Sequence, residues 1–264
     1  MPIPFTKAHG TKNDFLLTKN SDAPGKGLAE IAIAICDRHT GIGADGWMLI
    51  EPAAAGDDGA IRLFNSDGSE AEISGNGTRC AAAFLIRQGH NDPMIRIRTA
   101  AGTKTLRLLE RDGNRFRFEM NMGAPEVIDE KFMLPLPPGL REVMLLWVGN
   151  PQCAMAVESF DFDWRALGAE IERHPHFPNR TNVSFWRARD EHTLEVLFWE
   201  RGAGETMSSG TGSTGAFAAA IRRSAIQSPA TVITPAGPLQ LRWDGEIYLE
   251  GPAEIVADGV FLGS

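Results

Sequence analysis

The chain has 264 residues, of which 43% are hydrophobic and 23% are charged, which is the balance of a globular protein large enough to bury its own core. Its 26 Lys and Arg against 34 Asp and Glu give a net charge of −8, so nucleic acid and anionic membrane surfaces are poor partners. Residues 1–10 contain no apolar signal segment, and no apolar run long enough to span a membrane occurs. We therefore expect a cytoplasmic protein.

The three cysteines, Cys36, Cys80 and Cys153, are odd in number and widely spaced, so no disulfide framework is expected. Cys36 and His39 have the spacing of one pair of metal ligands, but no second pair accompanies them. The sequence therefore predicts no metal site.

In the first half of the chain, a helix is predicted at 27–36 and strands at 62–64 and 95–98. Between these strands, Ser74-Gly75-Asn76-Gly77 begins an apolar, alanine-rich helix that runs to residue 87. Asp112-Gly113 then separates two runs of alternating apolar residues, which is the pattern of a β-hairpin. A proline-rich segment, 134–139, is predicted to be a surface linker.

The second half continues with a predicted helix at 164–173 and a strand at 194–198. Ser209-Gly210-Thr211-Gly212 then begins a second apolar, alanine-rich helix, which ends near residue 222. Asp244-Gly245 again separates two alternating runs and predicts a second hairpin.

The two halves repeat each other. The turn at Ser209 follows the turn at Ser74 by 135 residues, and the same offset relates Glu205 to Glu70 and 234–237 to 99–102. Chance similarity of glycine-rich turns does not explain several landmarks in one order at nearly one spacing. We predict an α/β (α+β) fold with two pseudo-symmetric halves, each a mostly antiparallel sheet wrapped around a central helix. The predicted domains are 1–118, completed by 252–264, and 119–251.

Each Ser-Gly-x-Gly turn before a helix presents backbone N–H groups at the positive end of the helix dipole, which is an anion site. Ser74 and Ser209 are also suited to be simple N-caps, which stabilise a helix by about 1 kcal/mol. As a pseudo-symmetric pair the two turns suggest a pocket with two sides. The spacing Gly210-x-Gly212-x-x-Gly215 matches a dinucleotide fingerprint, but no buried strand precedes it and no acidic residue follows it at the required distance.

Several strings together resemble the diaminopimelate epimerase family, in its order and spacing. They are Lys7–Phe15, Asp37–Gly46, Phe64–Glu70, Gly149-Asn150-Pro151, Thr181-Asn182-Val183 and Glu200–Thr206. The resemblance implies an active site in the cleft between two similar halves, a homodimer, and no cofactor. It also implies interconversion of LL- and meso-diaminopimelate in lysine and peptidoglycan precursor biosynthesis, by inversion of a carbon that bears an ammonium and a carboxylate. Such a reaction needs two acid/base groups on opposite faces of that carbon.

The resemblance also assigns the site residues. The reacting carboxylate is bound by Gly75, Asn76, Gly210 and Thr211. The second amino-acid group of the substrate is bound by Asn13, Asn65, Asn150, Asn182 and Arg201. The catalytic positions are Ser74, Ser209, Glu200 and Gln152. An arginine among amides suits bidentate recognition of a carboxylate, although each Asn is equally suited to a turn or cap and Arg201 to a surface ion pair.

Both turns depart from the family, which has cysteine where this chain has Ser74 and Ser209. A thiol has a pKa of about 8.5 and water about 15.7, so a hydroxyl base costs about 10 kcal/mol more to ionise. The family's histidine after Gly-Asn-Pro is Gln152 here, which removes a titratable group. Gly46 replaces a glutamine that contacts the substrate in some members. We expect very low epimerase activity for this chain as written.

Two explanations of the serines are open. In the first, the chain is a diaminopimelate epimerase whose catalytic cysteines were replaced or lost, with substrate binding intact. Retention of Arg201 and its neighbours favours that explanation. In the second, the chain is a natural branch of the family with a different function: a different amino-acid racemase, a dehydratase with a single base, or a non-catalytic amino-acid binding protein. Gln152 favours the second explanation.

Overall fold

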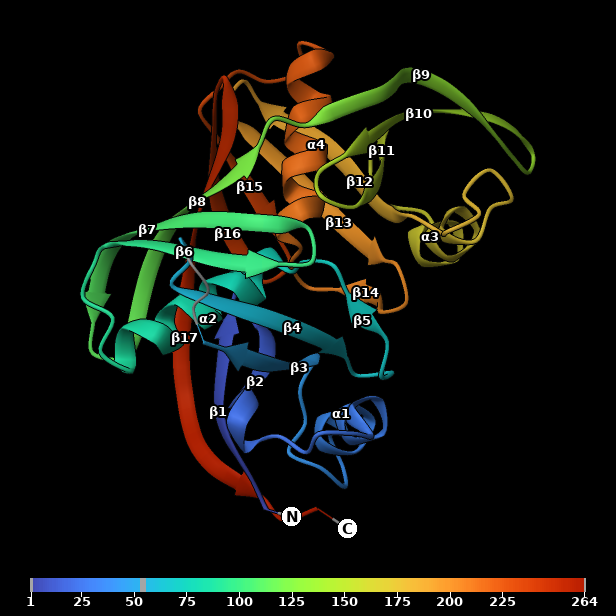
Figure 1. Cartoon of the computed structure of the whole chain (residues 1–264). Helices are drawn as coiled ribbons and strands as arrows, with labels where there is room; N and C mark the ends of the chain where they lie inside the picture. Colours follow the sequence, from blue (N-terminus) through green and yellow to red (C-terminus); the bar gives the residue numbers. More distant parts are fainter. Residues whose placement is uncertain (1, 53–55, 264) are drawn as a thin grey trace. The chain divides into compact units, whose positions relative to one another are not determined.

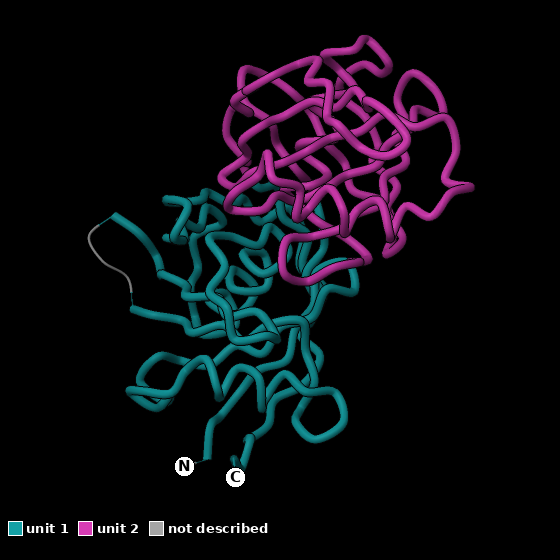
Figure 2. The backbone as a smooth tube through the Cα atoms, turned by 90° about the vertical axis from the view of Figure 1, so that its right-hand side faces the viewer, with its two compact units in different colours: residues 1–120, 251–264 teal, residues 121–250 magenta. Residues whose placement is uncertain are grey.

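The computed structural model describes residues 2–52 and 56–263 and divides the chain into two compact units (Figure 2). Unit 1 consists of residues 1–120 and 251–264, and unit 2 of residues 121–250. The chain passes between the units at two places only, near 120 and near 250. Each unit is described separately below.

Unit 1 is a sheet that closes around one helix (Figure 1). Its elements are β1 (Ile3–Gly10), β2 (Asn13–Lys19), a 3-10 turn (Asn20–Asp22), α1 (Leu28–Cys36), β3 (Gly46–Glu51), β4 (Gly59–Asn65), β5 (Glu70–Ala71), α2 (Gly75–Arg87), β6 (Met94–Thr99), β7 (Gly102–Asp112), β8 (Arg115–Gly123) and β17 (Glu246–Phe261). Strand pairing runs from β17 through β1, β2, β3, β4, β6 and β7 to β8, and β8 pairs with β17 again. The β2–β3 and β4–β6 pairs are parallel and the others for which the register is defined are antiparallel.

Helix α2 lies inside this ring and contacts β1, β2, β4, β6 and β7. Because strands surround it, the helix is buried on every side, and residues 81–83 are completely inaccessible. Along each strand, alternate residues face the helix. In β6, Ile95 and Ile97 are buried, while Arg96 between them is exposed. Helix α1 packs against β3 and β4 with Ile33 half exposed, so it lies on the outside, as predicted.

Unit 2 repeats this plan. Its elements are β9 (Glu126–Leu136), β10 (Gly139–Trp147), β11 (Pro151–Ala156), α3 (Trp164–Glu172), β12 (Asn182–Asp190), β13 (Thr193–Glu200), β14 (Gly204–Thr206), α4 (Gly210–Arg222), β15 (Ala230–Thr234) and β16 (Gly237–Asp244). Again two pairs are parallel, β11–β12 and β13–β15. Helix α4 contacts β10, β11, β12 and β13, and is as deeply buried as α2. Two sheet-wrapped helices confirm the predicted fold class.

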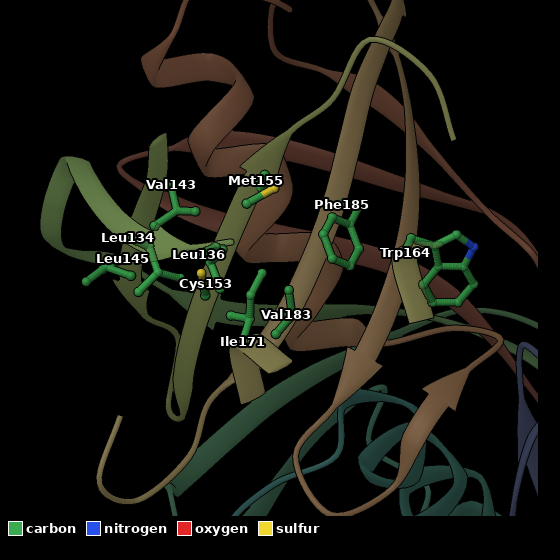
Figure 3. Packing of buried hydrophobic residues seen from close by; sticks show 10 residues of the cluster. All are labelled: Leu134, Leu136, Val143, Leu145, Cys153, Met155, Trp164, Ile171, Val183 and Phe185. Atoms are coloured by element: carbon green, nitrogen blue, oxygen red, sulfur yellow. The ribbon is translucent and has the colours of Figure 1, made fainter. Parts of the chain in front are cut away.

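The core between α3 and its sheet contains residues from five elements, β9, β10, β11, α3 and β12 (Figure 3). Cys153 comes from β11, Ile171 from α3, Phe185 from β12 and Leu134 from β9, and each is at most marginally exposed. Trp164, the first residue of α3, packs edge-on against Phe185. Trp164 at the start of α3 and Ile171 near its end thus hold both ends of the helix against the sheet.

The segment 134–139 is not a surface linker, and that prediction is wrong. It is the turn end of a hairpin in which β9 and β10 pair, with Leu136 opposite Gly139. Leu134 and Leu136 are buried in the core of unit 2. The prolines suggested a linker, but alternate residues still face inward because the strand continues through them.

The two repeats exchange their last strands. Strand β8 begins in unit 1, and its chain continues through β9, which pairs with β10 in unit 2. Strand β17 begins in unit 2, where it pairs with β16, and continues into unit 1, where it pairs with β1. Both predicted hairpins are present, with Gly113 and Gly245 in the left-handed conformation that such turns require.

Candidate active site

The two helix starts have the same backbone geometry. Ser74 and Ser209 are the N-caps of α2 and α4, with φ of −130° and −133°. The Oγ of Ser74 accepts a hydrogen bond from the N–H of Gly77, and the Oγ of Ser209 accepts one from the N–H of Gly212, both at 3.1 Å. Both hydroxyls are therefore engaged as caps, the simpler of the two roles considered for them.

The third residue of each helix must be glycine because the helix start packs closely on the sheet. A Cβ at Gly77 would lie 2.6 Å from Cε of Met48. A Cβ at Gly212 would lie 2.8 Å from Cδ1 of Phe198 and 3.0 Å from Oγ of Ser209. The second glycine of each Ser-Gly-x-Gly motif thus allows the capped turn to sit against its sheet.

In unit 1, two of the predicted substrate amides are hydrogen-bonded to each other. Asn76, buried in the first turn of α2, donates from Nδ2 to Oδ1 of Asn13 at 3.2 Å. Asn13 in turn donates from Nδ2 to Oδ2 of Asp45 at 2.7 Å. The direction of these bonds fixes which end of each amide donates.

Arg79, which the sequence analysis missed, sets this direction. It is completely buried, and its Nη2 donates to Oδ1 of Asn76 at 2.5 Å. Its Nε donates to the carbonyl of Pro252 at 3.0 Å, and Gly251 leaves room because a Cβ there would lie 2.8 Å from the guanidinium carbon. Burial lowers the pKa of Arg79 to about 10, which still leaves the group charged at neutral pH. A charged residue within an apolar helix was the available signal.

Asn65 lies at the same end of the unit 1 sheet as Asn13. It ends β4 opposite Gly46, which begins β3 and pairs with Phe15 of β2. The Nδ2 of Asn65 donates to Oγ of Ser69 at 3.0 Å within its own turn, which is the local role that Asn often has. At position 46 a Cβ would lie 2.8 Å from the carbonyl oxygen of Phe64, so close strand packing favours glycine there.

In unit 2, three predicted site residues form one hydrogen-bonded chain. Gln152, 2% exposed, donates from Nε2 to Oδ1 of Asn150 at 2.6 Å. Asn150 donates from Nδ2 to Oγ1 of Thr211 at 3.3 Å. The Oε1 atom of Gln152 is buried and has no hydrogen-bond partner among the residues that the structure describes. The side chain of Gln152 does not titrate, and its hydrogen bond to Asn150 orients that amide.

The remaining site residues of unit 2 surround the turn between β13 and β14. Asn182 accepts from the N–H of Arg201 at 3.0 Å and donates to the carbonyl of Pro151 at 3.0 Å. Glu200 accepts from Oγ1 of Thr206 at 2.6 Å, and the guanidinium of Arg201 donates to the carbonyl of Asn179 at 3.4 Å. Asn182 thus holds two backbone segments with one side chain.

The predicted site residues therefore form two sets, one in each unit. The unit 1 set is Asn13, Asn65, Ser74, Gly75 and Asn76, and the unit 2 set is Asn150, Gln152, Asn182, Glu200, Arg201, Ser209, Gly210 and Thr211. In each set an asparagine at the start of a strand, Asn13 of β2 or Asn150 directly before β11, bonds to the first turn of the central helix. The first N–H groups of such a helix have no partner within the helix, which makes each set suited to an anion.

The surviving cysteines are not candidates for the acid/base role. Cys36, Cys80 and Cys153 are all buried, and burial raises the pKa of each to about 12. A thiol with such a pKa carries almost no thiolate at neutral pH, so it is a poor base and a poor nucleophile.

Within the described ranges, 2–52 and 56–263, no group of three or more His, Cys, Asp or Glu side chains is placed to hold a metal ion. No helix among these residues has the length and apolarity to cross a membrane.

Solved structures share the fold. A hydroxyproline epimerase from Agrobacterium vitis, with bound trans-4-hydroxy-L-proline, aligns with a TM-score of 0.76 at 16% identity and covers 100% of this chain and 93% of its own. A Bacillus anthracis phenazine biosynthesis protein of the PhzF family aligns with a TM-score of 0.74 at 14% identity, covering 99% of each chain. At such low identity these structures support the architecture alone.

Sequence relatives are much closer. The diaminopimelate epimerase of Microcystis aeruginosa is 38% identical over 283 residues and covers 99% of both chains. That of Nostoc punctiforme is 38% identical over 281 residues and covers 98% of this chain and 99% of its own. The family model of diaminopimelate epimerase matches residues 5–128 and 144–256, which include every predicted site residue. The chain therefore belongs to the diaminopimelate epimerase family, whose members are isomerases.

Proposed function

We propose that this chain binds diaminopimelate and is a very slow epimerase because serine occupies both acid/base positions. One observation carries the proposal: Ser74 and Ser209 cap equivalent helices with matched dihedral angles and matched 3.1 Å hydrogen bonds. Epimerisation needs two such groups, one to remove the α-proton and one to return a proton to the other face.

The reacting carboxylate is assigned to the N–H groups of Gly75, Asn76, Gly210 and Thr211. Negative charge builds up on this carboxylate as the α-proton leaves, and preorganised N–H donors stabilise that charge. Asn13, Asn65, Asn150, Asn182 and Arg201 are assigned to the second amino-acid group, and Glu200 to the ammonium beside the acid/base pair. The support is that Asn13 bonds to Asn76 in the first turn of α2 and Asn150 bonds to Thr211 in the first turn of α4.

The serines are poor bases in this environment. The capping N–H stabilises an alkoxide on Ser74 or Ser209, but a hydrogen bond to a charged group contributes about 1.5–3 kcal/mol. That is well below the approximately 10 kcal/mol that separates a hydroxyl from a thiol. Gln152 adds no titratable group to the site.

The test is the double substitution Ser74→Cys/Ser209→Cys. We expect it to raise deuterium incorporation at the α-carbon of diaminopimelate in heavy water by about 10²- to 10⁴-fold, the usual range for a positioned acid/base pair. Ser74→Ala/Ser209→Ala is the matched control and should stay at the level of the unmodified chain. If the Cys/Cys variant folds and binds diaminopimelate but shows no exchange above the Ala/Ala control, the two-base mechanism is rejected.

A second candidate, a non-catalytic amino-acid binding protein, is favoured by the serines and by Gln152. Calorimetry of the unmodified chain with meso-diaminopimelate separates the two functions. Tight binding without any turnover supports the binding protein, whereas measurable turnover excludes it. Release of water and formation of a ketone or imine from a hydroxylated amino acid identifies a dehydratase instead.

We also propose, from family membership, that the chain serves lysine and peptidoglycan precursor biosynthesis in the cytoplasm, as a homodimer and without a cofactor. Sedimentation equilibrium of the purified chain tests the dimer: a molecular mass twice that of the chain is expected, and a monomer at micromolar concentration contradicts it.

A further inference from the structure

Glu172 is a buried carboxylate that no part of the proposed reaction uses. It is the last residue of α3 and is 2% exposed. A carboxylate at this position is disfavoured twice, because burial removes its hydration and because the C-terminal end of a helix is negative. Such a group persists only where donors compensate it.

Three donors converge on this carboxylate. Its Oε1 accepts from the backbone N–H of Gly202 at 3.0 Å and from Nη1 of Arg180 at 3.4 Å. Its Oε2 accepts from the indole Nε1 of Trp199 at 2.9 Å. The guanidinium of Arg180 is half exposed and its bond is the longest of the three, so the shorter bonds from Trp199 and Gly202 define the position of the carboxylate.

These two donors flank the pair Glu200 and Arg201 in the sequence. Trp199 precedes the pair and Gly202 follows it, while Asn182 binds the N–H of Arg201 itself. Gly202 has a φ of +78°, so the chain reverses sharply at the point that the carboxylate holds. The carboxylate at the end of α3 thereby accepts hydrogen bonds from both sides of a turn that lies about 30 residues further along the chain.

Close packing of α3 against the sheet restricts the movement of Glu172. A Cβ at Gly168 would lie 2.7 Å from Cβ of Trp199, so the helix approaches β13 as closely as glycine allows. Ile171, next to Glu172, is completely buried in the core of unit 2 (Figure 3). The carboxylate has little freedom to follow a displaced turn.

We propose that Glu172 is a positioning residue that fixes the turn carrying Glu200 and Arg201, and so sets the affinity for the second carboxylate of the substrate. This inference rests on the proposed function, in which Arg201 binds that carboxylate. An arginine recognises a carboxylate through fixed, bidentate geometry, so a turn that is free to shift loses affinity without losing any contact group.

The test is Glu172→Gln in the full chain. The amide keeps the size of the carboxylate but has one acceptor oxygen, so either the indole N–H of Trp199 or the backbone N–H of Gly202 loses its partner. We expect the Kd for meso-diaminopimelate to rise about tenfold. Lysine has the same carbon chain without the second carboxylate, and its Kd should rise by a smaller factor, because it keeps only the ammonium assigned to Glu200. Hydrogen exchange at 200–206 should become faster.

Glu170→Gln is the matched control, because Glu170 lies on the same helix and is exposed. The proposal is overturned if Glu172→Gln has the same Kd for diaminopimelate as the control, or if the Kd for lysine rises by the same factor as the Kd for diaminopimelate. If Glu172→Gln does not fold, Trp199→Phe removes one donor while the carboxylate remains, and the same difference between the two ligands is expected at smaller size.

If the unmodified chain binds neither ligand, the proposed substrate is wrong, and the exchange measurement decides the inference alone. Unchanged exchange at 200–206 in Glu172→Gln then overturns it, and faster exchange confined to that turn supports it.

Discussion

The starts of α2 and α4 have the same capped backbone but different side chains behind it. In unit 1 the charged Arg79 donates to Asn76, which donates to Asn13. At the position equivalent to Arg79, α4 has Thr214, whose Oγ1 donates to the carbonyl of Gly210 within its own helix. Duplication thus kept the part of the site that depends on the backbone, while the side chains that orient it diverged.

The turns that end the fourth strand of each repeat differ in the same way. In unit 1 the turn at Asn65 is held mainly by its own residues, with Asp67 accepting from the N–H of Ser69, and otherwise by a bond from the N–H of Ser66 to the carbonyl of Asp45. In unit 2 the turn at Arg201 is held by Glu172 from α3. A turn that closes on itself tolerates changes elsewhere, whereas one held by a distant helix depends on that helix.

Because the two helix starts differ most at Arg79, we expect the largest loss of stability for Arg79→Met. The substitution removes a fully buried charged group together with its hydrogen bonds to Asn76 and to the carbonyl of Pro252, so we expect a loss of about 4 kcal/mol in the free energy of unfolding. Thr214→Val, at the equivalent position of α4, should cost about 1 kcal/mol. Urea denaturation measures both, and equal losses contradict a special role for Arg79.

A smaller difference is expected between the two closely packed glycines. An alanine at Gly212 meets the ring of Phe198, whereas one at Gly77 meets the flexible end of Met48. We expect Gly212→Ala to cost about 3 kcal/mol and Gly77→Ala about 1 kcal/mol in the free energy of unfolding. The same urea experiments test the order, and a larger loss for Gly77→Ala would reverse the packing argument.

The smallest difference is expected between the two caps. Ser74→Ala and Ser209→Ala each remove one capping hydrogen bond of the same length, and each should cost about 1 kcal/mol. Thermal unfolding of the two variants should therefore agree to within about 0.5 kcal/mol. A loss at only one position would show that the equivalence of the two helix starts does not extend to their stability.

Part of this molecule follows from short stretches of sequence. Both Ser-Gly-x-Gly turns, the helices they begin and both Asp-Gly hairpins were predicted, because a cap or a two-residue turn involves partners at most four residues apart. The repeat of these signals predicted the duplicated fold. The family was identified from its motifs alone. The roles of the thirteen site residues, the cleft and the domains 1–118 with 252–264 and 119–251 stay predictions.

Tertiary structure decided what distant segments do together. Arg79 meets Pro252 across 173 positions, Glu172 meets Gly202 across 30, and the strand at 134–136 is buried by a core from several elements. None of these has a local signal, because burial and hydrogen-bond partners depend on which strands become neighbours. A glutamate at a helix end looks ordinary in sequence, and an arginine in an apolar helix is noticeable there but its partners are not; only the closed sheet and the packed helix make both of them buried charges with defined partners.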